Sequence, residues 1–185
     1  MAEYYLISQL PSLDGISENT PLPVTSARFS ELCGQHLGKK AQKEFDGITL
    51  SPSRQAVRST SAVLSQWNDG ERMLRLALGK LRAEKMNKTF DAEVQSFPAA
   101  LLQAARTAVE IESPMEAEKF LNRHRLDFLE SIRPMDPFSE EYVFYYGLKL
   151  KLLERIRQFD TASGEIAYRK IYNSVLNAAG SEVPQ

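Results

Sequence analysis

The chain has 185 residues, of which 25% are charged and 43% are hydrophobic, and its formal net charge is −1. These values are ordinary for a globular domain that builds one sizeable core without metals or disulfides. The near-zero net charge provides no general attraction to nucleic acid or to an anionic membrane. The single cysteine, Cys33, excludes a disulfide within the chain and fits a reducing compartment.

The start of the sequence does not resemble a signal peptide. Glu3 stands where basic residues are expected, and the apolar run Tyr4–Ile7 is too short. No stretch approaches the roughly 20 apolar residues of a membrane-spanning helix. We therefore expect a cytoplasmic protein that reaches the inner membrane only through a partner.

Residues 1–60 are predicted to be a loop-rich part of a single domain that covers residues 1–185. Aromatic and β-branched residues at Tyr4–Ile7 favour a short extended segment. The prolines and the Asp-Gly pair in residues 11–24 predict a loop. Two short helical segments should follow, the first capped by Thr25 or Ser26 and ending near Leu37, the second over residues 39–45.

Residues 61–180 are predicted to form the main bundle. Residues 61–88 have a helical pattern that Asn68–Gly70 interrupts, which is compatible with one kinked helix or with two helices. Pro98 is expected to start the next helix. Ser113–Glu116 combines a Ser cap, a Pro in the first turn and a Glu at the capping-box position. A stripe follows it: Ala117, Phe120, Leu121, His124, Phe128 and Ile132.

Residues 138–179 predict a helical hairpin at the centre of the fold. Ser139 is expected to cap its first helix, and Tyr142–Leu148 is apolar on all sides, as in a helix inside a bundle. After a break near Gly164, the second helix carries a regular stripe: Tyr168, Ile171, Tyr172, Val175, Leu176 and Ala179. The predicted fold class is therefore mainly α, an antiparallel bundle of about six helices.

Few residues are candidates for catalysis. Cys33 and His36 are three residues apart, but a thiolate–imidazole pair also needs contact and an orienting third group. His124 lies on an apolar stripe, where a hydrogen-bonded core histidine is the simpler interpretation. Two His and one Cys without zinc-ligand spacing do not favour a zinc site.

Phosphate-binding loops and acid–base pairs are also not indicated. The sequence contains no GxGxxG or GxxxxGK[ST] motif. Glu116, Glu118, Glu140 and Glu141 lie at predicted helix starts, where the helix dipole favours negative charge. We therefore predict no catalytic residue, no cofactor and no metal.

Basic residues give the clearest candidates for partner docking. Residues 71–88 contain six Lys and Arg against two Glu, which a solvated helix face or an acidic partner would explain. RNA is less favoured because no aromatic stacking platform accompanies this run. Further cations interrupt the apolar helix, and Glu154 would pair with one of them or with a cation elsewhere. The candidate docking residues are Arg72, Arg75, Arg82, Lys85, Lys149 and Arg155.

Three segments carry a resemblance to a known family: Tyr4–Pro11, Phe120–Glu130 and Tyr145–Ile171. They contain Tyr-Tyr-Leu-Ile, an Arg- and Phe-containing helix, and an aromatic helix with Leu148-Lys149-Leu150, Phe159-Asp160 and Gly164. Together these segments resemble a bacterial family of uncharacterised proteins encoded in V-type ATPase operons. That family is in turn similar to the C-type (eukaryotic d-type) rotor-cap protein of the V/A-type ATPases.

The resemblance implies a non-catalytic role beside a rotor. The rotor-cap protein covers the membrane ring and receives the end of the central stalk, so the implied partners are those ATPase subunits. The implied process is proton or sodium transport. This chain is shorter than the rotor-cap protein, which favours a shortened version or a separate accessory subunit. The alternatives are a helical adaptor unrelated to the ATPase and an enzyme of another type.

Overall fold

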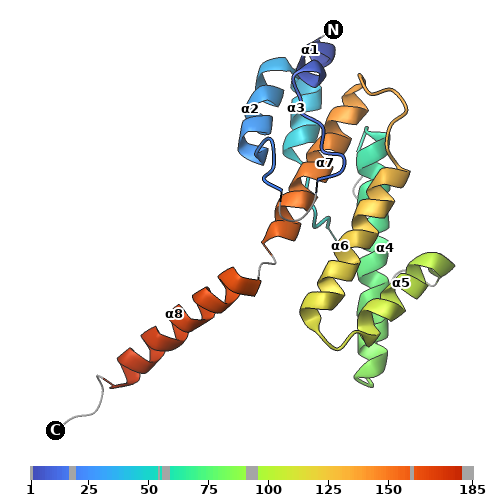
Figure 1. Cartoon of the computed structure of the whole chain (residues 1–185). Helices are drawn as coiled ribbons and strands as arrows, with labels where there is room; N and C mark the ends of the chain where they lie inside the picture. Colours follow the sequence, from blue (N-terminus) through green and yellow to red (C-terminus); the bar gives the residue numbers. More distant parts are fainter. Residues whose placement is uncertain are drawn as a thin grey trace.

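The computed structural model describes residues 2–16, 20–53, 55, 59–90, 96–158 and 161–180. This part of the chain holds eight helices and no strand, which confirms the mainly α fold class. The helices are α1 (Ala2–Ser8), α2 (Ser26–His36), α3 (Lys39–Asp46), α4 (Ala62–Lys85), α5 (Ala99–Glu110), α6 (Pro114–Ser131), α7 (Glu140–Arg157) and α8 (Thr161–Gly180). The chain direction alternates between α4, α6 and α7 (Figure 1).

The predicted extended segment at Tyr4–Ile7 is wrong, because these residues belong to α1. Strand-forming side chains need a neighbouring strand to satisfy the backbone, and the described residues offer none. As a helix, α1 satisfies its own backbone and buries Leu6 completely. Tyr4 then stacks on Phe138, with 4.4 Å between the ring centroids.

Helix starts follow the predicted caps. Thr25, Ser61, Ser113 and Ser139 each accept a hydrogen bond from the backbone N–H three residues later. Such a cap satisfies one of the four unpaired N–H groups of a helix start. Pro98 precedes α5 without a side-chain cap. These four capped starts depend only on neighbouring residues.

The interruption expected at Asn68–Gly70 does not break the helix, because α4 runs continuously from Ala62 to Lys85. Gly70 instead lets α6 approach closely. A Cβ atom at this position would lie 2.5 Å from the Phe128 ring. A missing side chain thus marks a contact between helices in α4.

The first hydrophobic core surrounds α7. Residues 143–150 are all buried, and α1, α2, α3, α4 and α6 supply the surrounding side chains. Figure 1 shows α1, α2 and α3 beside one end of the molecule and α4 and α6 along the other side of α7. Gly147 allows this close packing, since a Cβ there would lie 3.2 Å from both Phe29 and Phe45.

A second, smaller core joins α4, α5 and α6. Leu74, Ala77 and Leu78 of α4 meet Ala105 and Ala108 of α5, with Leu121 of α6 beside them. Small side chains on α5 let this short helix lie close to α4. The longest helix of the body, α4, therefore contributes to both cores.

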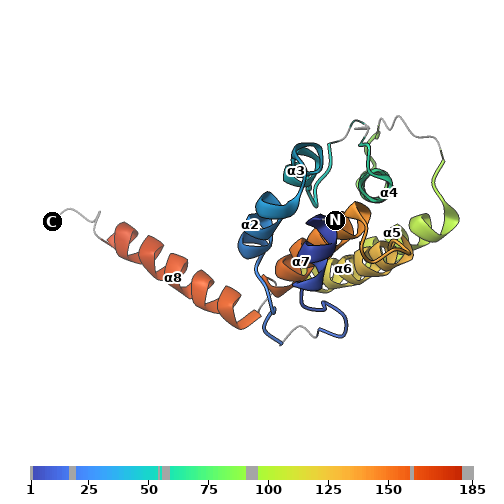
Figure 2. The same cartoon turned by 90° about the horizontal axis from the view of Figure 1, so that it is seen from above.

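The predicted hairpin is only half correct. The first helix, α7, is the buried helix that the sequence indicates, but α8 stands away from the other helices (Figures 1 and 2). Its stripe residues Tyr168, Ile171, Tyr172 and Val175 are 52–67% exposed. The predictions for Phe159, Asp160, the side chains of Leu176 and Ala179, and residues 181–185 lie outside the described residues.

Candidate functional site

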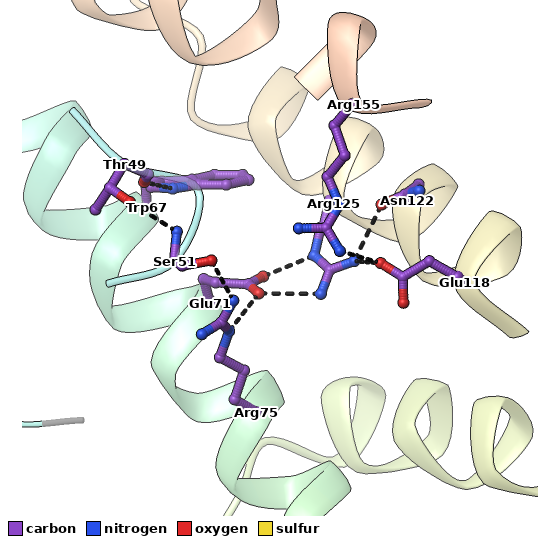
Figure 3. Close-up of polar contacts among 9 residues, drawn as sticks. All are labelled: Thr49, Ser51, Trp67, Glu71, Arg75, Glu118, Asn122, Arg125 and Arg155. Carbon is purple, nitrogen blue, oxygen red and sulfur yellow. Dashed lines mark hydrogen bonds and ion pairs between the residues drawn. The ribbon is translucent and has the colours of Figure 1, made fainter. Parts of the chain in front are cut away.

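A buried ion-pair network lies between α4 and α6, and Figure 3 shows its members. The Glu71 carboxylate of α4 is 1% exposed, and Arg125 of α6 donates two hydrogen bonds to it, at 2.9 and 3.0 Å. The second guanidinium terminus of Arg125 donates to Asn122 and Glu118, both at 3.1 Å. This two-bond geometry is the strong form of an Arg–carboxylate pair.

The network extends outward in two directions (Figure 3). Arg75 donates to Glu71 at 2.9 Å and to the Ser51 hydroxyl at 2.7 Å, which ties the 48–51 loop to α4. Arg155 of α7 donates to Glu118 at 2.6 Å. The network thus connects α4, α6 and α7 through side chains alone.

The electrostatics of this network favour permanently charged groups. Burial acts to lower the pKa of the Arg125 guanidinium, but Glu71 and then Glu118 outweigh it, so that pKa is raised. Three arginines surround the two carboxylates. A carboxylate held in this way accepts hydrogen bonds and has no proton to donate, so the arrangement fixes helices in place and does not suit acid catalysis.

A second charged cluster surrounds Lys149, which is 7% exposed on α7. Its ammonium nitrogen lies 2.6 Å from both Asp14 and Glu130. The Tyr145 hydroxyl donates to Glu130 at 2.7 Å, and Arg133 lies 3.5 Å from Asp14. Two cations therefore face two carboxylates where the loop before α2 meets α6 and α7.

The pKa shifts in this cluster all favour the ion pairs. A hydrogen bond from Lys149 is the main reason that the pKa of Asp14 is lowered. Burial acts to raise the pKa of Glu130, but hydrogen bonds from Lys149 and Tyr145 outweigh it and lower that pKa. Burial likewise acts to lower the pKa of Lys149, and its two carboxylate partners raise it instead.

Two glutamates hold the starts of other helices. Glu141 of α7 accepts hydrogen bonds from the Ser61 hydroxyl and from two backbone N–H groups at the start of α4. Glu154 accepts from both the backbone N–H and the hydroxyl of Ser26, at 2.7 and 2.5 Å. The position of Glu141 at its own helix start is therefore only part of its role, and Glu154 serves the start of α2.

The Cys33–His36 pair does not form a nucleophilic site. Cys33 is fully buried in the core around α7, and burial raises the pKa of its thiol to about 12. A thiol in such surroundings stays protonated and is inert. His36 lies against the Tyr5 ring, with 5.4 Å between centroids. His124 is half-buried on α6, so it is not the enclosed core histidine that its stripe predicts.

The candidate docking residues separate into two groups. Arg82 and Lys85 are exposed at the last turns of α4, close to exposed Lys88. We call Arg82, Lys85 and Lys88 the basic end of α4. Asn87 ends the helix there with a positive φ of 52°, and the Lys88 N–H bonds back to Ala83.

The remaining candidates are engaged within the molecule. Arg72 pairs with Asp69 at 3.2 Å, while Arg75 and Arg155 belong to the buried network. Lys149 is enclosed by its own carboxylates, which corrects its assignment as a docking residue. A buried and paired cation has no free surface to offer a partner.

Two shallow recesses lie near these residues. One, of about 230 Å³, is lined by Pro52, Ser53, Arg72, Arg75, Leu76 and Phe90. The other, of about 380 Å³, lies between the 48–51 loop and the end of α7. Its polar side chains are already bonded: Lys151 donates to the Ile48 carbonyl, and Glu154 accepts from Ser26.

The partners of Arg125 and Asp14 were not predicted from the sequence. A usable signal exists for the first, because Arg125 lies four residues after Leu121 and four before Leu129, both buried. Glu71 occupies the same kind of position before Leu74 and Leu78 on α4. Opposite charges on two apolar faces indicate a buried pair. No comparable signal points to Asp14, which lies in a loop.

Comparison of the chain with protein-family models, with curated proteins and with solved structures finds no match in any of the three. The described residues contain no group of three or more His, Cys, Asp or Glu side chains placed to hold a metal ion. Within the same part of the chain, no helix combines the length and apolar character needed to cross a bilayer.

Proposed function

We propose that this protein is a non-catalytic subunit of a bacterial V-type ATPase, a stiff body in or beside the central stalk. In this role it links the rotor stalk to the membrane sector during proton or sodium transport. The observation that carries the proposal is the charged network of Glu71, Glu118, Arg125 and Arg155, which holds three helices to one another.

The network suits a protein that transmits force. Helices packed only by apolar side chains slide past one another at low cost, because dispersion contacts have little directional preference. Paired Arg–carboxylate bonds are directional and resist such sliding. The buried α7 helix supports the same role, since the two ends of the first core are connected through it.

The choice of a V-type ATPase depends on the resemblance alone. Its residues are those of the body: Leu6 is fully buried, Arg125 is in the network, and Tyr145–Leu150 form the centre of the first core. A relationship carried by packing residues concerns the body's architecture. The docking surface has to be tested separately.

The basic end of α4 is the docking surface that we propose. Arg82, Lys85 and Lys88 are exposed where the helix dipole is negative, which explains why cations are tolerated there without a partner. An acidic protein of the stalk or ring would approach this end preferentially, because complementary charge increases association rates.

Co-purification tests the proposal. A tagged full-length chain is expressed in its native bacterium, membranes are solubilised gently, and captured proteins are identified by mass spectrometry. We expect subunits of the ATPase stalk and membrane ring. Recovery of a defined complex without ATPase subunits would favour the unrelated adaptor, and recovery of no ATPase subunit in repeated captures contradicts the proposal.

The docking surface has a matched test of its own. The double variant Arg82→Glu/Lys85→Glu reverses two exposed charges and should reduce capture of ATPase subunits about tenfold or more, with an unchanged unfolding midpoint. Arg106→Glu/Arg123→Glu makes the same charge change at two other exposed positions, on α5 and α6. Equal loss with both double variants would show that net charge matters and the basic end of α4 does not.

A further inference from the structure

The uncovered face of α8 is the largest apolar surface that the described residues leave without a neighbour. Tyr168, Ile171, Tyr172 and Val175 follow one another at short helical intervals, so they share one side of the helix. Each is at least half exposed, and Tyr168 stacks on Tyr172 with 6.1 Å between ring centroids. We call these four residues the α8 face.

This face has no free place on its own body. The neighbouring helix α7 is already covered along residues 143–150 by α1, α2, α3, α4 and α6. Both views show α8 extending away from that body (Figures 1 and 2). A helix of 20 residues is marginal in water unless its apolar side is covered. The cover must therefore come from outside the chain.

We propose that the α8 face pairs with the α8 face of a second copy of this chain, in antiparallel orientation about a two-fold axis. With the axis between residues 171 and 172, Tyr168 lies opposite Val175 of the second copy, and Ile171 lies opposite its Tyr172. Each ring then meets a smaller aliphatic side chain. A parallel pair would place Tyr168 against Tyr168, which fills the space between the helices less well.

The area of this face suits a weak dimer. An aromatic side chain buries about 150–250 Å² when it is fully covered, so the four tyrosines of two copies provide roughly 600–1,000 Å² at most. The isoleucines and valines add to this value. A specific interface needs at least about 1,000 Å², so the pair lies at that threshold, where micromolar dissociation constants are expected.

The charges of α8 favour a protein partner over a lipid surface. Glu165 and Arg169 pair with each other at 2.6 Å, which leaves Lys170 as the uncompensated cation of residues 164–175. Each basic residue near an anionic membrane contributes only about 1 kcal/mol, so one lysine gives little attraction. Helix pairing needs no net charge.

The oligomeric state of the full chain tests the proposal. Sedimentation velocity from low to high micromolar concentration should show a monomer–dimer equilibrium. Ile171→Glu, which places a carboxylate inside the pair, should raise the dissociation constant by at least about tenfold. The control is Ile166→Glu, the same substitution in the same helix, about 140° around the axis from Ile171 and 70% exposed. This control should dimerise like the wild type.

A crosslinking experiment tests the orientation. Cys33 is fully buried, so it does not compete with introduced thiols. Mixing Tyr168→Cys chains with Val175→Cys chains and adding a short bismaleimide should give mainly the mixed dimer. Mainly Tyr168→Cys homodimers would overturn the antiparallel arrangement, and Ile166→Cys should give little of either product.

Three other outcomes overturn the pairing of two copies. These are a monomer at all concentrations, a dimer that Ile171→Glu leaves intact, and a monomer that floats with phosphatidylglycerol-containing vesicles through the same face. The pairing does not depend on the ATPase proposal. Loss of ATPase capture with an intact dimer, or the reverse, identifies which of the two has failed.

Discussion

Helices α7 and α8 follow one another and have similar lengths, 18 and 20 residues, but their surroundings are opposite. Ten residues of α7 are buried, whereas the described side chains of α8 are all exposed. The α7 sequence is apolar on every side over Tyr142–Leu148, so any compact arrangement must enclose it. The α8 sequence is apolar on one side only, which requires one neighbour and does not specify which.

The two helices also differ in how their charges are used. The cations of α7 are used within the body, where Lys149 meets Asp14 and Glu130 and Arg155 meets Glu118. The ion pair between Glu165 and Arg169 joins two residues of α8 itself. Contacts between helices explain the rigidity of the body, while the α8 pair stabilises only its own helix.

The largest expected effect is the loss of a buried charge partner. Arg125→Met removes two hydrogen bonds from Glu71 and leaves that carboxylate 1% exposed with Arg75 as its remaining cation. We expect the free energy of unfolding, measured by urea titration, to fall by about 3–5 kcal/mol. Arg169→Met, which breaks the exposed pair of α8, should cost no more than about 0.5 kcal/mol.

The double variant Glu71→Leu/Arg125→Met shows whether this cost is due to the unpaired charge. Replacing both partners with apolar side chains removes the uncompensated carboxylate, so stability should return toward the wild-type value. If Arg125→Met costs less than about 1 kcal/mol, the network does not hold α4 and α6 together as we describe.

A smaller effect separates the two helices through their glycines. Gly147 of α7 faces the Phe29 and Phe45 rings, so Gly147→Leu should overpack the first core and destabilise the body by about 1–3 kcal/mol. Gly164 of α8 has open space around its Cα, so Gly164→Leu should only increase helix propensity, by about 1 kcal/mol.

Urea titration measures the first glycine variant, and hydrogen exchange of the α8 amides measures the second. Greater protection in α8 with an unchanged body is the expected pattern for Gly164→Leu. Clear destabilisation of the body by Gly164→Leu would mean that α8 packs on the body and that the contrast between the two helices is wrong.

The features that the sequence predicted well are local ones. The caps at Thr25, Ser113 and Ser139 involve residues only three positions apart, and the character of α7 is contained in one continuous run. Propensity and period are properties of such short windows, so they can be assessed without knowing the fold.

The features that it missed depend on distant residues. Glu71 and Arg125 are 54 positions apart, and Lys149 and Asp14 are 135 positions apart. A charged side chain on an apolar face has to find a partner, but one sequence does not specify which residue the fold will bring to it. For the same reason Lys149 was expected at a docking surface, and α8 was expected inside the bundle.

The smallest expected effect is a change in acid sensitivity at the α7 end of this comparison. Lys149 lowers the pKa values of Asp14 and Glu130 in the folded chain. As the pH falls from about 5 to 3, the unfolded chain therefore takes up protons before the folded chain does, and stability decreases. Lys149→Gln removes the cause of both shifts, so its urea midpoint should fall less over this interval than that of the wild type.

The slope against pH is the informative quantity, because Lys149→Gln also lowers stability at neutral pH by removing a buried ion pair. A variant that is merely less well packed would shift all midpoints by a similar amount and keep the wild-type slope. Lys170→Gln removes the same charge from the exposed surface of α8 and should keep both the slope and the midpoint. If Lys149→Gln has the wild-type slope, the cluster at Asp14 and Glu130 is not coupled to folding, and the contrast in charge between α7 and α8 fails.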